Sequence, residues 1–467
     1  MRTDTIAAIA TGMSNSGIGI VRISGDEAFE IAGRVFRTAS GKMVNISNFS
    51  SHTIHYGQIC DGDETIDEVL LMIMKGPKSY TAEDTVEINC HGGILMVRRV
   101  METVLKYGAR TAQPGEFTKR AFLNGRIDLS QAEAVADVIS ARNQYALKNS
   151  MEQLEGAVSR RVKELRSRIL YEIARIESAL DDPEHMSLDG YSEDLLAKVE
   201  DMGGQVEKLI RSADDGRVMS EGIKTVILGK PNAGKSSLMN VLLGQERAIV
   251  TDVAGTTRDT LEEHIDLQGI SLNVVDTAGI RDTEDVVERI GVERAVKAAR
   301  DGDLIIYVVD GSRPLDENDE EIIRMIHKND LDVDCFVDQK VIVLLNKTDL
   351  QICVEKEELE RRTGRPVIPV SAKEQQGIEN LEAEIRRMFF GGELKFNEEV
   401  YITNIRHKEA LQAALESLRM VENSIRQGLP EDFYSIDLTD AYESLGLIVG
   451  ESVGDDVVNE IFSRFCM

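Results

Sequence analysis

The stretch Gly229-Lys230-Pro231-Asn232-Ala233-Gly234-Lys235-Ser236 follows the spacing G-x-x-x-x-G-K-S. A strand-like run, 225–228, precedes it directly, and a helical stretch, 237–243, follows it. Glycines at these positions let backbone N–H groups surround phosphates at the start of a helix, while Lys235 adds positive charge and the Ser236 hydroxyl ligates Mg²⁺. A chance glycine-rich turn is a poor alternative, because it would not need a strand before it and a helix after it. The sequence therefore predicts nucleotide contacts from Asn232, Ala233, Gly234, Lys235, Ser236 and Ser237.

Apolar runs alternate with amphipathic stretches on the C-terminal side of this loop. The runs are 225–228, 271–275, 304–309, 341–345 and 367–370. Such alternation is typical of a parallel sheet with helices on both faces. We therefore predict an α/β domain over residues 217–390.

Three of these runs end in residues that suit a nucleotide. The carboxylate of Asp276-Thr277-Ala278-Gly279, after 271–275, can hold the water shell of Mg²⁺, and the N–H of Gly279 can reach the γ-phosphate. In Asn346-Lys347-Thr348-Asp349, after 341–345, the aspartate can accept two hydrogen bonds from guanine that adenine cannot supply. Ser371-Ala372-Lys373, after 367–370, would complete the base pocket. The expected nucleotide is GTP, and this order of motifs resembles that of the translation-factor-type GTPases.

The catalytic group is not evident from the residues. Ras-type GTPases place a water-orienting glutamine after the D-T-A-G run, but Ile280 stands there in this chain. Residues 249–259 are expected to form a mobile loop, with Thr257 a candidate second Mg²⁺ ligand and with oxygen atoms for a monovalent cation beside Asn232. Nearby carboxylates are the other candidates, and the residues alone do not select among Asp282, Glu284, Asp285 and Glu288.

The rest of the chain shows two other patterns of hydrophobic residues. Residues 1–118 mix β-like runs (19–23, 68–74 and 85–90) with helical stretches, which indicates an α+β domain. Helical spacing of three and four recurs in two stretches: Val158, Val162, Leu165, Ile169, Ile173, Ile176 and Leu180, and then Leu411, Ala414, Leu418, Val421 and Ile425. We expect a helical-bundle domain in two parts, 119–216 and 391–467, interrupted by the α/β domain. The predicted fold class is thus multidomain α+β and α/β, with an inserted Ras-like P-loop GTPase domain.

Composition limits the classes of partner. The chain has 467 residues, of which 42% are hydrophobic and 29% charged, so it can form real cores and is not disordered. Its net charge of −28 repels nucleic acid at long range, so any RNA contact needs a local basic patch or a partner's surface. Five cysteines without a C-x-x-C pair favour a reducing cytoplasm. No apolar run is long enough for a membrane span and no targeting segment is visible, so we expect a cytoplasmic protein without a membrane partner.

Several segments outside the nucleotide motifs resemble one family. They are DTIAAIAT at 4–11, GIGIVRISG at 17–25, PGEFT at 114–118, AFLNGRIDL at 121–129, QAEA at 131–134, GTTRD at 255–259 and FSRFC at 462–466. On these residues the chain resembles the tRNA-modification GTPases of the MnmE (TrmE) family, over essentially its whole length. The resemblance implies an N-terminal domain that binds folate and dimerises, so that a homodimer is expected.

The resemblance also implies the reaction. Together with an FAD-dependent partner, expected in a heterotetramer, the family adds an aminomethyl or carboxymethylaminomethyl group at C5 of the wobble uridine of certain tRNAs. A tetrahydrofolate derivative (5-formyl- or methylene-tetrahydrofolate) is the one-carbon donor, and FAD is bound by the partner. The alternative from another class is a regulatory switch, such as a ribosome-assembly GTPase. The N-terminal α+β domain and the terminal cysteine favour the enzyme subunit.

The family's functional residues fall on definite positions. By similarity, Arg22, Glu83 and Arg126 would hold the folate, the alternative being ordinary surface salt bridges. The resemblance implies K⁺ binding by Asn232, Thr251, Val253 and Thr256, and it selects Glu288 for the network that activates water. It also makes Cys466 a participant in the modification chemistry, or a residue that positions it. A buried small hydrophobe is the alternative for a lone cysteine.

Two further features have plain alternatives. Cys90-His91 suggests a nucleophile, but its strand context and the lack of a third partner favour a structural role. A basic series on the long helical stretch, which could meet tRNA phosphate, is better explained as a solvated helix face: Arg160, Arg161, Lys163, Arg166 and Arg168.

Overall fold

The computed structural model describes residues 4–141, 143–182, 185, 190–245, 262–267, 270–275, 302–326, 339–390, 401–451, 453–463 and 465. The chain divides into two compact units. One comprises Met1–Ser140, Ser150–Val206 and Glu409–Met467, and the other comprises Ala141–Asn149 and Glu207–Lys408. An inserted unit between two parts of a helical one agrees with the predicted fold class. The boundaries at residues 118, 216 and 390 stay predictions.

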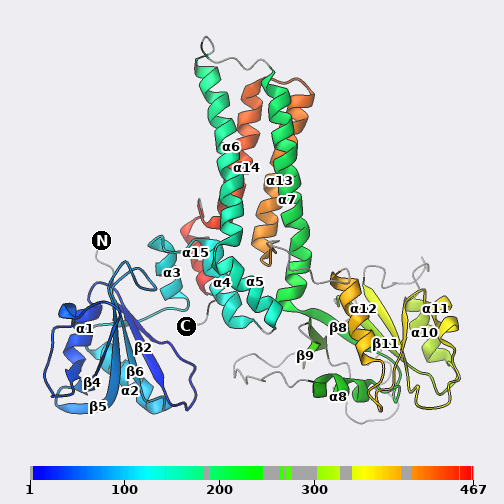
Figure 1. Ribbon diagram of the computed structural model, residues 1–467, viewed down its shortest axis with the longest axis horizontal. Helices are drawn as coiled ribbons and strands as arrows, with labels where there is room; N and C mark the ends of the chain where they lie inside the picture. Colours follow the sequence, from blue (N-terminus) through cyan, green and yellow to red (C-terminus); the bar gives the residue numbers. More distant parts are fainter. Residues whose placement is uncertain are drawn as a thin grey trace. The chain divides into compact units, whose positions relative to one another are not determined.

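A seven-stranded sheet begins the first unit, in the order β3-β4-β5-β6-β2-β1-β7 (Figure 1). Neighbouring strands are antiparallel, except for the parallel pair β1 and β7. Helices α1 (Ala28–Val35) and α2 (Ile94–Lys106) pack against the sheet, with alternate strand residues in the shared core. The strands are β1 (Ile6–Ile9), β2 (Gly19–Ser24), β3 (Phe36–Thr38), β4 (Thr53–Asp61), β5 (Glu64–Met74), β6 (Thr85–Cys90) and β7 (Arg110–Thr111), and a 3₁₀ turn, η1, spans Ile46–Asn48.

On β4 and β5, the residues that alternate with the core residues form an exposed apolar area. Tyr56 is the cross-strand partner of Leu70, and both side chains are about half exposed, as is that of Ile54. Since successive side chains of a strand point to opposite faces, these residues lie on the face away from the core.

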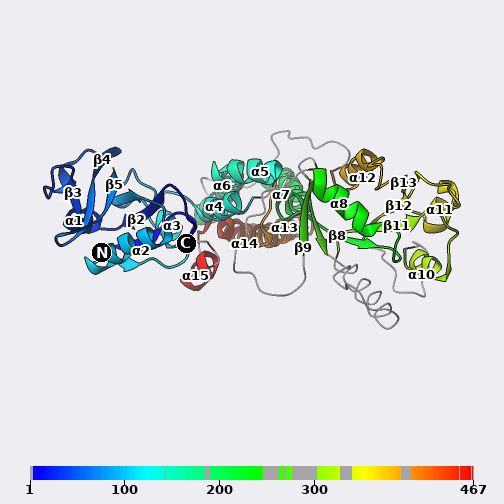
Figure 2. The same ribbon diagram turned by 90° about the horizontal axis from the view of Figure 1, so that it is seen from below.

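Helices make up the rest of the first unit. They are α3 (Glu116–Leu123), α4 (Leu129–Ser140), α5 (Gln144–Leu154), α6 (Ala157–Asp181), α7 (Tyr191–Glu221), α13 (Ile405–Arg426), α14 (Glu431–Val449) and α15 (Asp455–Ser463), with α5, α7 and α13 extending into the second unit. Figures 1 and 2 show α6, α7, α13 and α14 side by side as a bundle, in which α6 packs along α14. The predicted apolar faces of α6 and α13 are buried, with two exceptions.

The exceptions lie at the helix ends. Leu180 was expected in the core but is 49% exposed, because in the last turn of α6 the small Ala179 takes the buried position. Ile425, in the last turn of α13, is only half buried.

The end of the described chain packs on α3. Phe462 of α15 joins Ala121, Ile127 and Leu129 in a small core. The approach is closest at Gly115, where φ is +67° and an added Cβ would lie 2.6 Å from the carbonyl oxygen of Phe462. A glycine is therefore required at the start of α3.

The second unit contains a six-stranded sheet in the order β13-β12-β11-β8-β10-β9. Two separate cores lie on its faces: α8 and α12 contribute to one, and α10 and α11 to the other, which confirms helices on both faces. All pairs are parallel except β9 with β10, so the edge strand β9 departs from the predicted parallel sheet. The elements are β8 (Ile223–Leu228), α8 (Lys235–Gln245), β9 (Glu262–Leu267), β10 (Ile270–Val275), β11 (Leu304–Asp310), α10 (Glu317–Ile326), β12 (Lys340–Asn346), α11 (Lys356–Thr363), β13 (Val367–Pro369) and α12 (Ile378–Phe390).

Across the described part of the chain, no helix has the length and apolar character that crossing a membrane requires.

Candidate functional site

The G-x-x-x-x-G-K-S loop joins β8 to α8, as predicted. Gly229 has φ +148°, and an added Cβ would lie 2.5 Å from the carbonyl oxygen of Val308. Gly234 has φ +101°, and its Cβ would lie 2.1 Å from the side-chain nitrogen of Asn346. Asn232 also has a positive φ, +64°, which asparagine tolerates better than most residues. Both glycines are therefore dictated by backbone conformation and by the neighbouring strand ends.

Lys235 is the first residue of α8, and its ammonium group donates hydrogen bonds to the carbonyl oxygens of Gly229 (2.5 Å) and Lys230 (2.8 Å). Burial lowers the pKa of Lys235. Ser236 and Ser237 follow in the first helical turn and are exposed. Free N–H groups at a helix start, a lysine and a serine hydroxyl form a donor set that fits a phosphate chain with its Mg²⁺.

Asn346, at the end of β12, connects the phosphate loop with the base loop. Its buried amide group donates to the carbonyl oxygen of Ala233 at 2.8 Å and accepts from the N–H of Ala372 at 3.1 Å. Lys347 has φ +66°, and its ammonium group lies 2.6 Å from the carboxylate of Asp310. Burial acts against ionisation of Asp310, but hydrogen bonds from Lys347 and Ser312 hold its pKa below the ordinary value.

Asp349 lies beside the third predicted segment. The Ser371 hydroxyl donates to one of its carboxylate oxygens at 2.8 Å, and the Lys373 ammonium group is 4.0 Å from the other. The structure thus brings together the residues predicted for the base pocket: Asn346, Lys347, Asp349, Ser371, Ala372 and Lys373. Their contacts with guanine stay predictions.

An ion-pair cluster behind the phosphate loop was not predicted. The Lys230 ammonium group pairs with Asp316 at 2.7 Å and with the buried carboxylate of Asp319 at 2.5 Å. Tyr307 of β11 donates to the other oxygen of Asp319 at 3.0 Å. No sequence signal connects Lys230 with acids more than 80 positions away, because the contact depends on where α10 begins.

The other residues predicted for catalysis and metal binding lie outside the described part of the chain. They are Thr251, Val253, Thr256 and Thr257 of the loop, Asp276, Thr277, Ala278 and Gly279, the acidic candidates including Glu288, and Cys466.

Two arginines of the predicted folate site converge on one aromatic ring. The guanidinium carbons of Arg22 and Arg126 lie 5.3 and 4.7 Å from the centre of the Tyr80 ring. Phe117 of α3 is 5.5 Å from Arg22 on the same measure. Arg22 also pairs with Glu87 at 2.7 Å. Neither aromatic residue was predicted, although Phe117 lies within the quoted segment 114–118.

Glu83 is held within the first unit. It pairs with Arg120 at 3.1 Å and accepts from Ser24 at 2.8 Å. Arg120 is itself buried and reaches Asp4 and Glu116. The ion pairs of Arg22 and Glu83 are those that the salt-bridge alternative expects, but they are largely buried rather than on the surface.

The Cys90-His91 pair does not form a nucleophile. Burial, with a smaller contribution from the Asp67 charge, raises the pKa of the Cys90 thiol to about 11, and the thiol donates to the carbonyl oxygen of Gly19 at 3.4 Å. His91 turns to Asp67, 2.7 Å away. A neutral buried thiol supports the structural role.

The basic series on α6 has partners inside the first unit. Ion pairs join Arg161 to Glu164, Lys163 to Asp128, Arg166 to Glu451 and Arg168 to Asp201. Arg160 donates to the carbonyl oxygen of Glu155. Arg166 is buried over the Tyr442 ring, so it does not lie on a solvated face.

Comparison with known proteins decides the family. A model described as the GTP-binding protein TrmE N-terminus matches residues 5–126, and one described as the MnmE helical domain matches residues 129–466. The chain belongs to the MnmE family. It is 56% identical to the tRNA modification GTPase MnmE of Lachnoclostridium phytofermentans over the full length of both chains. The proteins of that name from Geobacillus kaustophilus and Bacillus subtilis are 47% and 44% identical, with 99% of each chain covered.

Membership of the MnmE family accounts for the pairing of a nucleotide loop with an N-terminal domain that a simple GTPase lacks. These relatives give no support to the ribosome-assembly alternative.

Proposed function

We propose that this chain is the GTP-hydrolysing subunit of a tRNA-modifying complex. With an FAD-dependent partner it adds an aminomethyl or carboxymethylaminomethyl group at C5 of the wobble uridine of certain tRNAs. The observation that carries the proposal is the pair of family matches, residues 5–126 and 129–466, together with a phosphate loop of the required geometry inside the second match.

GTP and Mg²⁺ bind at the carboxyl ends of β8 and β12. Lys235 and the N–H groups at the start of α8 hold the phosphates, and Ser236 offers its hydroxyl to the metal. Asp349, oriented by Ser371, accepts the guanine N–H groups. Asn346 fixes the phosphate loop relative to the base pocket through its hydrogen bonds with the backbone of Ala233 and Ala372.

Hydrolysis proceeds without a glutamine next to Gly279, and we propose K⁺ in its place. The cation would be held by Asn232 together with Thr251, Val253 and Thr256. Asn232 has a positive φ and is exposed in the phosphate loop, and a side-chain amide oxygen suits K⁺. Such a cation supplies positive charge beside the leaving phosphate. Glu288 positions the network that activates water, and Thr257 serves as a second Mg²⁺ ligand.

A tetrahydrofolate derivative binds between Arg22 and Arg126. Their guanidinium groups suit the carboxylates of a glutamate tail, and the rings of Tyr80 and Phe117 suit the flat pterin. Glu83 would accept hydrogen bonds from the pterin edge, with Arg120 as the residue that positions it. The donor set therefore fits this class of cofactor.

The last described residues of the chain lie next to α3. Phe462 and Phe465 contact Gly115 at the start of α3, which also carries Phe117 and Arg120. We propose that Cys466, one residue beyond Phe465, takes part in the modification chemistry or positions it.

The assembly is a homodimer joined through the N-terminal domain, with the FAD-dependent protein completing a heterotetramer. The half-exposed apolar residues Ile54, Tyr56 and Leu70 supply a face for the second copy. Because the chain carries a net charge of −28, much of the tRNA backbone contact would come from the partner's surface. We place the complex in the cytoplasm, where its tRNA substrates are.

Mass spectrometry of tRNA nucleosides tests the proposal. Cells that lack the chain should lose the C5-modified wobble uridine and regain it when the gene is restored. Unchanged nucleosides, together with a defect in ribosomal subunits, would favour the assembly switch instead.

A further inference from the structure

The side chain of Lys230, in the phosphate loop, is anchored at the start of α10. Its ammonium group lies 2.7 Å from the carboxylate of Asp316 and 2.5 Å from that of Asp319. The Lys230 side chain is 16% exposed and the Asp319 side chain 2%. Burial acts against the charged form of Lys230, but hydrogen bonds to the two carboxylates raise its pKa above the ordinary value. The anchor is therefore an ion pair that is largely shielded from water.

The two carboxylates are fixed because they also cap α10. One oxygen of Asp316 accepts from the N–H groups of Asn318 and Asp319, at 3.0 and 3.3 Å. In return, one oxygen of Asp319 accepts from the N–H of Asp316 at 3.1 Å. The Tyr307 hydroxyl donates to the other oxygen of Asp319 at 3.0 Å. This reciprocal pattern is that of a capping box, so the helix start holds both acids in place for Lys230.

The backbone of Lys230 in turn holds the lysine predicted to bind phosphate. The carbonyl oxygen of Lys230 accepts from the Lys235 ammonium group at 2.8 Å and from the N–H of Ala233 at 3.2 Å. The carbonyl oxygen of Gly229 accepts from the same ammonium group at 2.5 Å. Since the side chain and the carbonyl belong to one residue, an anchor on the Lys230 side chain restricts the carbonyl that holds Lys235.

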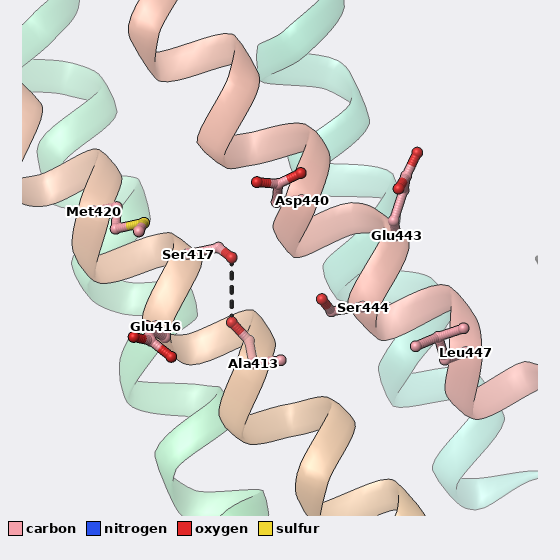
Figure 3. Close-up of a pocket in the computed structure, with 8 residues that line it drawn as sticks. All are labelled: Ala413, Glu416, Ser417, Met420, Asp440, Glu443, Ser444 and Leu447. Carbon is pink, nitrogen blue, oxygen red and sulfur yellow. Dashed lines mark hydrogen bonds between the residues drawn. The ribbon is translucent and has the colours of Figure 1, made fainter.

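The acidic side chains between α13 and α14 provide a contrast. A hollow of about 480 Å³ separates these helices, and Figure 3 shows Asp440 between them, with Glu416 and Glu443 on the outer sides. All three acids are exposed. An exposed carboxylate is screened by water and contributes little to the position of a neighbour. Replacing Glu416 and Glu443 therefore removes two negative charges without disturbing a buried ion pair.

We propose that Lys230 is a positioning residue for GTP hydrolysis and acts through Lys235. Anchored by Asp316 and Asp319, it fixes the carbonyl oxygen that aims the Lys235 ammonium group at the phosphates. This inference rests on the proposed function, which assigns the phosphates to Lys235. The start of α10 thereby supports the nucleotide site, although α10 carries none of the nucleotide motifs.

Neutralisation of the two acids is the competing role for Lys230. In that case its charge would serve only to prevent Asp316 and Asp319 from repelling the phosphates of GTP. The two roles differ in what happens when the acids are removed together with the lysine. Removal of the acids restores a site that needed only neutral surroundings, but it does not restore an anchor.

GTP turnover and nucleotide affinity of the full-length chain test the proposal. Lys230→Met removes the ammonium group, and Lys230→Arg keeps a cation for the carboxylates. A neutral variant combines Lys230→Met with Asp316→Asn and Asp319→Asn. The control, Glu416→Gln with Glu443→Gln, removes two exposed charges from the other unit. Thermal unfolding gives the folded fraction of each variant, to which the rates are referred.

Lys230→Met should lower kcat about tenfold and weaken GTP binding about tenfold, because Lys235 loses its fixed acceptor. The neutral variant should be equally impaired, Lys230→Arg should regain most of the activity, and the control should match the original chain. If Lys230→Met does not fold, Asp316→Asn replaces it, since the Asp316 side chain is 56% exposed, and it should lower kcat about threefold.

Normal turnover in folded Lys230→Met, or in Asp316→Asn where that variant replaces it, overturns the positioning role and leaves the proposed function intact. Full recovery in the neutral variant assigns Lys230 to neutralisation instead, and a folded Lys230→Arg chain that stays as slow as Lys230→Met overturns the anchor. Failure of the original chain to bind GTP overturns the proposed nucleotide site itself.

Discussion

The side-chain amide of Asn346 donates a hydrogen bond to the backbone carbonyl of Ala233, 2.8 Å away. Its oxygen accepts from the N–H of Ala372 at 3.1 Å. One buried side chain thus joins the base loop, the phosphate loop and the segment after β13, which come from three separate parts of the sequence. The same side chain leaves no room for a Cβ at position 234, because a Cβ added to Gly234 would lie 2.1 Å from the amide nitrogen of Asn346.

Replacing Asn346 with Ala should weaken GTP and GDP binding alike, by about 10- to 100-fold. The variant leaves buried backbone groups at Ala233 and Ala372 without their partner, which costs roughly 1–3 kcal/mol. Titration with a fluorescent nucleotide measures the effect, and the exposed neighbour change Glu374→Ala is the control. Loss of GTP but not GDP affinity would contradict this role, because neither contact involves the γ-phosphate.

Replacing Asp349 with Asn should shift the preference from guanine to xanthine nucleotides, since a carbonyl replaces the amino group of the base. Ser371→Ala, which removes the 2.8 Å hydrogen bond to Asp349, should lower GTP affinity several-fold and leave the preference for guanine unchanged. Competition binding with GTP and XTP measures both. Full GTP affinity in the Asp349→Asn variant would remove this residue from the base pocket.

GTP hydrolysis should be faster in K⁺ than in Na⁺ at equal ionic strength. The proposed oxygen ligands around Asn232 form a cage that suits the larger ion. In the same phosphate-release assay, Glu288→Ala should slow turnover while leaving GTP binding nearly intact, as expected for a group that acts in the transition state. Equal rates in the two salts would exclude the cation, and a large loss of nucleotide affinity would make Glu288 structural.

Removal of the Tyr80 ring should reduce affinity for 5-formyltetrahydrofolate by about tenfold, because one aromatic contact is worth roughly 1 kcal/mol and both guanidinium groups lose their common neighbour. Tyr80→Ala should leave GTP turnover unchanged, since the nucleotide site belongs to the other unit. Tyr171→Ala, at an exposed position of α6, serves as the control. Unaltered folate binding would place the cofactor elsewhere.

Cys466→Ser separates the two roles of the terminal cysteine. If the thiol serves the chemistry, the variant should keep its fold, its dimer and its GTPase rate but lose the wobble-uridine product. If the thiol is only packed, the buried hydroxyl costs on the order of 1–3 kcal/mol of stability, and activity falls only as folded protein is lost. Thermal stability, GTP turnover and modified nucleoside are measured on one preparation. Normal product from a stable variant would end the chemical role.

The strands described in the second unit, except β9, were predictable because each is an apolar run that the fold buries. The run 304–309 became β11, Leu304–Asp310, and 341–345 became β12, Lys340–Asn346, each extended by one residue at one or both ends. The edge strand β9 was missed, since four of the six residues of Glu262–Leu267 are polar and the segment acquires strand structure by pairing antiparallel with β10. Edge strands carry a weaker apolar signal than central ones.

Motif residues of the candidate site were found by spacing, but the groups that hold them were not. Lys230 meets Asp319, and Arg120 meets Glu83, only because tertiary folding brings distant segments together. Charged residues such as Arg120 and Arg166 appear in the sequence as surface side chains, yet both are buried. No local pattern distinguishes a buried, paired arginine from a solvated one.

The contact of α15 with α3 has a consequence for synthesis of the chain. Lys119 and Asn459, which are hydrogen-bonded across this contact, are 340 positions apart. At about 5–20 residues per second, α3 emerges from the ribosome roughly 20–70 s before α15. Ala121, Ile127 and Leu129 stay without Phe462 throughout that interval, during which the whole inserted unit is made and is free to fold. A nascent chain stalled before α15 should therefore bind nucleotide while its N-terminal part still exposes an apolar surface that chaperones recognise.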